Sequence, residues 1–504
     1  MLGNMKFRSQ QLKAQPFLAI SILGAFLFLL TLAWLNSLIP LLALLAILAI
    51  ATFALWMMAS DFRNLATLYV IVVLFSPSLF RDLSFVSSGV RLDHIVLACV
   101  AFLLLFRLLI TGRMRRLNLA VVLFALYIVS ALITVWLHLG VNPNSSLIGE
   151  LVAIQGLARP LIVLVVFSIL LRTEQQVKNI VWAVVIGGSV MAVFALLQFI
   201  HIDVVVDFTA NYFDRKVHPV VLGDRGAVVG TFDGLHNSVA LFFVLYISLC
   251  VALLWNSGAA LSMRVKAFII MAALTAFFGL IGSFSRTGFL ALVASIGTIL
   301  LLRHHSLLGN RLLLVVGSAG LLFTATAITS HFVKFIRVRF IGELLSLDFV
   351  LADPRFQVAA PRMFDAFMEH PLFGSGFDLG TAGDIGFLVE LASLGLVGFI
   401  LYFLTISYVM HSAIQVIRLK PTGIYLPLAA SVLAVSVGML VASISGVPFR
   451  GTRLMEIYWL LVACLIFAKR DTLMALRNGQ LQVDDSDANT TPDSTQRQHS
   501  GLTT

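Results

Sequence analysis

The chain is 504 residues long; 60% of them are hydrophobic and only 12% are charged. An average soluble protein has roughly 45–50% apolar and about 25% charged residues, and the mean hydropathy of this chain is +1.01. This composition excludes a soluble globular enzyme, a disordered protein and a disulfide scaffold. The formal net charge of +10 has to be interpreted by position, because basic residues also orient proteins in membranes.

Apolar stretches long enough for a transmembrane helix, which needs roughly 20 residues, follow one another along the chain. They predict an all-α polytopic membrane bundle of about 12–14 transmembrane helices. The predicted spans are 17–35, 38–58, 64–80, 93–110, 118–139, 151–171, 179–200, 236–255, 267–284, 286–302, 311–330, 385–409, 424–446 and 454–468. The spans 64–80 and 286–302 are short, and Pro77 breaks the first of them.

Basic residues predict how the bundle is oriented. If the N-terminus is cytoplasmic, every loop on the inner side carries at least one Lys or Arg, as the positive-inside rule requires. Both termini are then expected inside, and the long loops 201–235 and 331–384 outside. The regions that we expect are N-terminal transmembrane helices at 1–200, a core at 201–446, a last transmembrane helix at 447–470 and a polar, mostly disordered tail at 471–504.

Arginines recur in the external segments, where positive residues are disfavoured. Those of interest are Arg215, Arg225, Arg286, Arg355 and Arg362. Long loops are translocated whatever their charge, which is an alternative explanation for all of them except Arg286, because Arg286 lies in a short outer turn. The planar guanidinium group binds phosphate oxygens in a bidentate way and stays charged. The cluster therefore favours a phosphate or pyrophosphate ligand.

Two of these arginines stand in local patterns that suit an anion. Arg225 lies in a glycine-rich loop before His236-Asn237, which opens a predicted helix with free N–H groups. The alternative is a glycine-rich turn that Asn237 caps. Arg286 follows Ser283-Phe284-Ser285 at the outer end of a hydrophobic hairpin, where a charge indicates function unless the side chain only extends to the interface.

The second long loop predicts a short amphipathic helix from Arg362 to His370, which Pro371 ends. Its predicted apolar face consists of Met363, Phe364 and Phe367. A surface pair between Arg362 and Asp365 is the simple structural explanation of Arg362. Further along, Asp384 suits a helix N-cap, whereas Glu390, about two turns into the next span, is a costly intramembrane charge.

The remaining intramembrane charges are Glu150, Arg159, Arg453 and Glu456. Glu150 and Arg159 face roughly opposite sides of one helix, so they are not expected to pair. Arg453 and Glu456 are three residues apart and are expected to satisfy one another. The three cysteines lie in apolar runs, and the chain has no GxxxxGK[ST], HExxH, CxxC or GxGxxG pattern. We therefore expect no nucleotide, metal or other cofactor.

The motifs occur in an order that resembles the O-antigen ligase/polymerase family of bacterial inner-membrane proteins. The elements are Arg225…Gly230-Thr231-Phe232…Asn237, Ser283-Phe284-Ser285-Arg286, Arg362…His370-Pro371-Leu372-Phe373-Gly374-Ser375-Gly376 and Glu390…Gly395-Leu396-Val397-Gly398. The resemblance covers about 200–440, and it extends to the N-terminal spans only by hydropathy.

What the resemblance implies is metal-independent glycan transfer from undecaprenyl diphosphate on the periplasmic face. It implies that Arg225, Arg286 and Arg362 neutralise the diphosphate, to which we add Arg159, Arg355 and Arg215 as further contacts. The candidates for the general base that the acceptor hydroxyl needs are His236, Asp384 and Glu390. The expected partners are the lipid-linked oligosaccharide, membrane lipid, and a chain-length regulator and flippase of the same pathway, with no nucleic acid.

One departure from the family pattern favours polymerase over ligase activity. Ligases carry a His-Asn or His-Asp pair where this chain reads Gly383-Asp384-Ile385. The expected function is thus a polymerase of exopolysaccharide, capsule or O-antigen, with transfer to lipid A-core as the alternative. A lipid-linked glycan flippase or secondary transporter is an alternative of another class, which the charges Arg159, Glu390 and Glu456 favour and the absence of internal repeats disfavours.

Overall fold

The structure is a computed structural model, and its description covers part of the chain. The described residues are 65–75, 78–79, 90–91, 93–94, 96–101, 104, 118–141, 147–200, 202–206, 236–256, 261–303, 355–377, 385–444, 446–448 and 452–478. The predicted spans 17–35, 38–58 and 311–330 lie outside these residues, as do most of loop 201–235, residues 331–354 and the tail from 479.

Helices account for almost all of the described chain. They are α3 (Leu65–Phe75), α5 (Leu119–Val141), α6 (Leu147–Leu170), α7 (Glu174–Phe199), α9 (His236–Asn256), α10 (Met263–Gly282), α11 (Arg286–Arg303), α15 (Ala360–Glu369), α16 (Gly386–Arg418), α17 (Tyr425–Ala442) and α18 (Thr452–Arg477). A π-helical turn (Arg355–Ala359) precedes α15. The strands β1 (Ser78–Leu79) and β2 (Val90–Arg91) form a minimal antiparallel ladder in which Ser78 is opposite Arg91.

Seven helices in the described part of the chain are long and apolar enough to cross a membrane, which confirms a polytopic all-α membrane bundle. They are α5, α6, α7, α9, α10, α16 and α17. The predicted spans at these places begin and end within a few residues of the observed helices, except that α16 is much longer than 385–409. The helices α3 and α11 are apolar but shorter.

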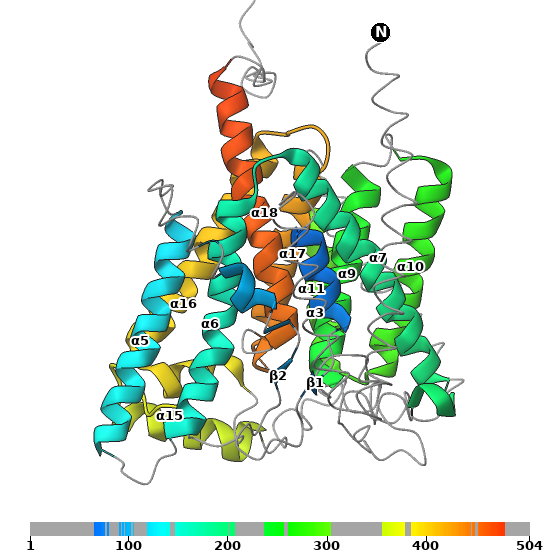
Figure 1. The fold of residues 1–504 in the computed structure, drawn as a ribbon. Helices are drawn as coiled ribbons and strands as arrows, with labels where there is room; N and C mark the ends of the chain where they lie inside the picture. Colours follow the sequence, from blue (N-terminus) through cyan, green and yellow to red (C-terminus); the bar gives the residue numbers. More distant parts are fainter. Residues whose placement is uncertain are drawn as a thin grey trace, which may run out of the picture.

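The helices are arranged as layers around a common core, and they expose apolar side chains outward. Figure 1 shows α17 and α18 in the middle of the bundle, with α15 at one end and the C-terminal end of α18 at the other. We call the end of the bundle at which α15 lies the α15 end. The side chain of Trp136 on α5 is 76% exposed, and α10 exposes Met271. Such residues suit a lipid-facing surface, because lipid is as apolar as they are.

Glycines allow the inner helices to approach closely, as small residues do in membrane bundles. A Cβ atom at Gly188 of α7 would lie 2.2 Å from the ring of Tyr246 on α9. The same atom at Gly288 of α11 would lie 2.5 Å from Ala240 Cβ. These contacts fix how α7 and α11 pack on α9, and α11 also packs against α17.

Candidate functional site

The motif Pro371–Phe377 is a turn that docks into a break in α16. The break lies at Gly395, whose φ of +64° and ψ of −168° are not helical. The N–H groups of Ser375 and Gly376 donate to the carbonyl oxygens of Ala392 (2.9 Å) and Ser393 (3.1 Å). The turn therefore binds carbonyl groups that the break withdraws from the helical pattern.

The hydrogen bonds also run in the opposite direction across the break. The N–H of Leu396 donates to the carbonyl oxygen of Pro371 (2.9 Å), and the N–H of Val397 donates to that of Leu372 (3.1 Å). Non-helical backbone inside a membrane bundle has to be satisfied by other protein groups, and here the turn and the broken helix satisfy one another. The two motifs that the sequence places twenty residues apart are thus one structural unit.

Glycine is required at both sides of this contact. Gly374 has a φ of +72°, and a Cβ atom there would lie 2.4 Å from the carbonyl carbon of Ser393. A Cβ atom at Gly395 would lie 2.4 Å from the backbone of Leu372. Neither backbone can move away without breaking the hydrogen bonds between them, so no larger residue fits.

Side chains of α5 and α6 hold the turn in place. The hydroxyl of Thr134 donates to the carbonyl oxygen of Phe373 (2.5 Å), and both carboxylate oxygens of Glu150 accept from the N–H of Phe377 (3.1 and 3.0 Å). The Nε2 atom of His138 lies 3.9 Å from Glu150 Oε1. Thr134 and His138 were not among the predicted site residues and carry no local sequence signal, because only the fold brings them to the turn.

Glu390 lies in the first segment of α16 and is 3% exposed. The hydroxyl of Tyr127 on α5 donates to its Oε2 atom at 2.9 Å. Tyr127 also lines a narrow cleft between α5, α6, α16 and α18, whose aromatic wall residues also include Phe124, Tyr402 and Trp459. The intramembrane charge that the sequence singles out is therefore a buried carboxylate bound to a residue that lines this cleft.

Arg362 lies on the exposed side of α15. Among the described residues no ion pair joins it to Asp365, so the predicted surface pair does not form. The predicted apolar face is also partly wrong. Met363 and Ala366 are the residues that pack against Val389 and Ala392 of α16, whereas Phe364 is 51% exposed, because α16 contacts α15 from the side of Met363.

Arg286 begins α11 after a tight turn. The hydroxyl of Ser285 accepts from the N–H of Gly288 (3.0 Å) and so caps the helix. Phe284 has a φ of +52°, which is uncommon for a residue with a side chain. Asn237 is not the cap of α9 that the sequence suggests as an alternative: it lies inside α9, and its Oδ1 atom accepts from Ser285 (2.7 Å).

The residues between α17 and α18 connect Arg286, Arg362 and Glu390. A Cβ atom at Gly446 would lie 3.5 Å from the side chain of Thr287, which follows Arg286. Val447 packs against the cluster that contains Met363 and Val389, the neighbours of Arg362 and Glu390. The three predicted site residues therefore belong to elements that meet at the α15 end of the bundle.

Five other predicted site residues lie outside the described residues or have side chains outside them. They are Arg215, Arg225, His236, Arg355 and Asp384. His236 is the first residue of α9, and Arg355 begins the π-helical turn before α15. Their roles as ligands of a diphosphate or as a base stay predictions.

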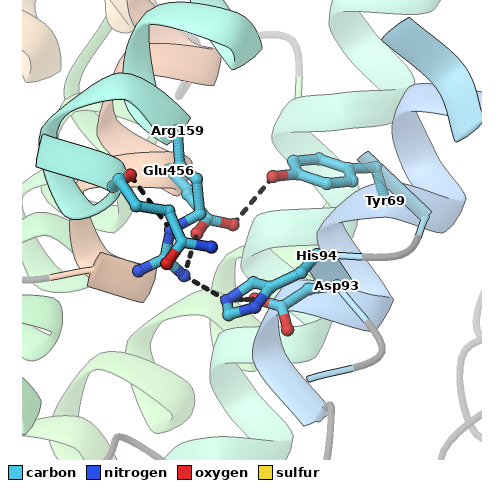
Figure 2. A network of polar contacts seen from close by, with 6 residues as sticks. Tyr69, Asp93, His94, Arg159 and Glu456 are labelled. Atoms are coloured by element: carbon cyan, nitrogen blue, oxygen red, sulfur yellow. Dashed lines mark hydrogen bonds and ion pairs between the residues drawn. The ribbon is translucent and has the colours of Figure 1, made fainter. Parts of the chain in front are cut away.

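A second group of polar residues lies inside the bundle. Figure 2 shows Tyr69 of α3, Asp93 and His94 of a neighbouring helical segment, Arg159 of α6 and Glu456 of α18 pointing toward one another. The hydroxyl of Tyr69 donates to Glu456 Oε2 (2.7 Å). Asp93 and Glu456 are almost fully buried, with exposed fractions of 0% and 1%. We call these five residues the interior network.

Arg159 is the centre of the interior network. Its Nη1 atom contacts His94 Nε2 and lies 3.7 Å from Glu456 Oε1. Glu150 accepts a hydrogen bond from the turn, whereas Arg159 contacts His94 and Glu456. These different partners are consistent with the expectation that Glu150 and Arg159 do not pair. The pair of Arg453 and Glu456 stays a prediction. A diphosphate at Arg159 would have to compete with Glu456, which disfavours Arg159 as a ligand residue.

The interior network contains atoms that could hold a metal ion, but its charge opposes one. Ligand atoms of Asp93, His94 and Glu456 lie within 4.8 Å of one another. The guanidinium of Arg159 contacts two of these three residues. A divalent cation at the same place would be repelled by this positive charge in surroundings of low dielectric constant. The geometry therefore favours an internal ion-pair network.

The chain was also compared with known proteins. No protein-family model matches it, and no curated protein has a significantly similar sequence. The resemblance to the O-antigen ligase/polymerase family consequently rests on the motifs alone. What the geometry adds is that two of these motifs, Pro371–Phe377 and the residues around Gly395, form one structural unit.

Proposed function

We propose that this protein is a membrane glycosyltransferase that joins oligosaccharide repeat units, carried on undecaprenyl diphosphate, into a surface polysaccharide on the periplasmic face of a bacterial inner membrane. The observation that supports this proposal most is that the elements carrying Arg286, Arg362 and Glu390 meet at the α15 end. These residues supply cations for a diphosphate and a carboxylate for an acceptor hydroxyl at one end of an apolar bundle.

The proposed reaction needs only the groups at this end of the bundle. The acceptor hydroxyl oxygen bonds to the anomeric carbon of the growing glycan, and the bond from that carbon to the diphosphate breaks. Glu390 takes the hydroxyl proton. Arg286 and Arg362 stabilise the negative charge that develops on the leaving diphosphate, and Tyr127 orients Glu390 through its hydrogen bond.

Polymerase activity is proposed ahead of ligase activity on the sequence of one segment. The chain reads Gly383-Asp384-Ile385 where ligases of the resembled family typically carry a His-Asn or His-Asp pair. The acceptor in a polymerase is the next lipid-linked repeat unit, whereas in a ligase it is lipid A-core. Transfer to lipid A-core stays the alternative within the same chemistry.

Transport is the second candidate function, and the interior network favours it. A transport path distributes charge through the bundle, and Asp93, Arg159 and Glu456 lie inside it. Transporter sites are also formed at broken helices, and α16 is broken at Gly395. A flippase of the lipid-linked glycan would use these features without forming a glycosidic bond.

The test is glycan synthesis by the purified protein in vesicles that contain the lipid-linked repeat unit. We expect longer lipid-linked glycans, and we expect Arg362→Ala to abolish them while the amount of folded protein stays unchanged. Glu369→Ala, at an exposed position of the same helix, is the matched control and should retain synthesis. Normal product from Arg362→Ala contradicts the diphosphate role, and movement of the glycan across the bilayer without lengthening supports transport.

A further inference from the structure

The helix α15 has two apolar faces, of which only one is covered by the bundle. Met363 and Ala366 pack against α16. On the other side, Phe364 is 51% exposed and Met368 is 60% exposed, and Leu372 in the following turn is 60% exposed. Phe364 and Met368 are four residues apart, so they lie on the same side of the helix.

Hydrogen bonds fix the level of α15 relative to the lipid-facing surface. The turn that follows α15 is bound at Phe373 by Thr134, which lies two residues before the exposed Trp136. The same turn is bound at Phe377 by Glu150, which lies three residues after the exposed Leu147. The turn that follows α15 therefore lies at the same level along the bundle as the exposed apolar residues at the ends of α5 and α6.

Tryptophan at this level is itself informative. Trp side chains are enriched where the acyl region meets the headgroups, and Trp136 is 76% exposed. Figure 1 shows α15 lying across the end of the bundle, and not along its axis. The axis of α15 is thus transverse to the long apolar helices that are candidates to cross a membrane.

The polar side of α15 carries charges of both signs. Arg362, Asp365 and Glu369 are all exposed. Asp365 and Glu369 are each one residue beyond Phe364 and Met368, so they are rotated by roughly 100° around the helix from the apolar pair. A helix with one apolar and one charged side, and with low net hydrophobicity, is typical of a segment that lies in the interface of a bilayer.

We propose that α15 is an in-plane helix that binds the lipid bilayer at the boundary between headgroups and acyl chains. Phe364, Met368 and Leu372 lie in the acyl region, and Asp365 and Glu369 face water. Because the charges on α15 are mixed, the partner is the bilayer as such and not anionic lipid in particular. This contact holds Arg362 at the level of the headgroups, and it does not depend on which reaction the protein catalyses.

The test measures what touches each side of the helix in vesicles of zwitterionic phospholipid. Spin labels are attached to Phe364→Cys and Met368→Cys, with Asp365→Cys and Glu369→Cys as the adjacent matched controls. Cys99→Ala removes the half-buried native thiol, and the buried Cys250 and Cys464 are retained. Collision with molecular oxygen reports the acyl region, and collision with a water-soluble nickel chelate reports water.

We expect the oxygen-to-nickel collision ratio to be several-fold higher at 364 and 368 than at 365 and 369. Equal ratios at all four positions would place both sides in water and overturn the proposal. Protection from both reagents at 364 and 368 would mean that a second copy or another protein covers this face, which also overturns it. All four substitutions are at exposed positions, so the labelled proteins are expected to fold.

Discussion

The α15 end and the interior network both contain buried carboxylates, but they hold them differently. At the α15 end, the partners include neutral donors: the hydroxyl of Tyr127 binds Glu390, and the N–H of Phe377 binds Glu150. In the interior network, the guanidinium of Arg159 faces Glu456. A cation inside the bundle stabilises the charge permanently, whereas Arg362 remains exposed and accessible to a ligand.

This difference assigns different tasks to the two regions. Arg159 and Glu456 join α6 to α18, and Tyr69 adds α3, so the network holds together helices that are distant in sequence. The α15 end joins a broken helix, a turn and an exposed arginine. We therefore expect substitutions in the network to lower stability, and substitutions at the α15 end to lower activity unless they disturb the turn.

The largest effect is expected where the turn enters α16. Gly395→Ala places a Cβ atom 2.4 Å from the backbone of Leu372 in a conformation that only glycine adopts readily. We expect a loss of more than about 4 kcal/mol in unfolding free energy, the range of exceptional substitutions. The measurement is the yield and thermal unfolding of the purified variant, and a wild-type melting temperature would contradict the docked turn.

The next largest effect is expected for Arg159→Met, which leaves Glu456 buried without the guanidinium that faces it. Breaking a buried ion pair costs about 3–5 kcal/mol, and replacing both partners with apolar residues is often much less costly. The double variant Arg159→Met with Glu456→Met should therefore unfold at a higher temperature than the single one. If both synthesise polymer normally per folded molecule, the network is structural; lost synthesis in a stable double variant would favour transport or catalysis there.

A smaller loss of stability is expected for Tyr127→Phe, since it removes one buried hydrogen bond to Glu390. The loss of such a bond is expected to lower the unfolding free energy by about 1–3 kcal/mol. Glu390→Gln keeps an oxygen that can accept from Tyr127, so its stability should change less. If Glu390 is the base and Tyr127 orients it, Glu390→Gln should abolish glycan synthesis and Tyr127→Phe should only reduce it. Full synthesis by Glu390→Gln would exclude Glu390 as the base.

The smallest effect is expected for Gly297→Ala in α11, where a Cβ atom would meet nothing within 4 Å. Alanine has the higher helix propensity by about 1 kcal/mol, so the variant should be as stable as the wild type or slightly more stable. It is the glycine control for Gly395→Ala in the same unfolding measurement. A large loss at Gly297 would mean that the effect at Gly395 is not specific to the docked turn.

The sequence predicts the helices well and their tertiary contacts poorly. Hydropathy places α5, α6, α7, α9, α10 and α17 within a few residues, because long apolar runs have few alternatives in a membrane. It also predicts a helix ending before Pro371, as α15 does at Glu369. It assigns Phe364 to the buried face, because amphipathicity alone does not tell which of two apolar sides the bundle covers.

The candidate site shows the same limit. Glu390 and Arg159 are identified by the cost of charge in a membrane, but their partners Tyr127 and His94 come from distant helices and have no local signal. The docking of Pro371–Phe377 into the break at Gly395 depends on backbone hydrogen bonds between segments that are apart in sequence. Neither the hydrophobic periodicity nor the residue spacing of the sequence indicates such backbone hydrogen bonds.

The most direct test of the central claim is a gel of surface glycan from a strain that lacks this protein. Complementation uses the wild-type gene or the Arg362→Ala variant. We expect polymer to be lost, with lipid-linked repeat units or single capped repeats accumulating, and to return only with the wild-type gene. Long glycan that is still made on its lipid carrier but is absent from lipid A-core would contradict polymerisation and identify a ligase.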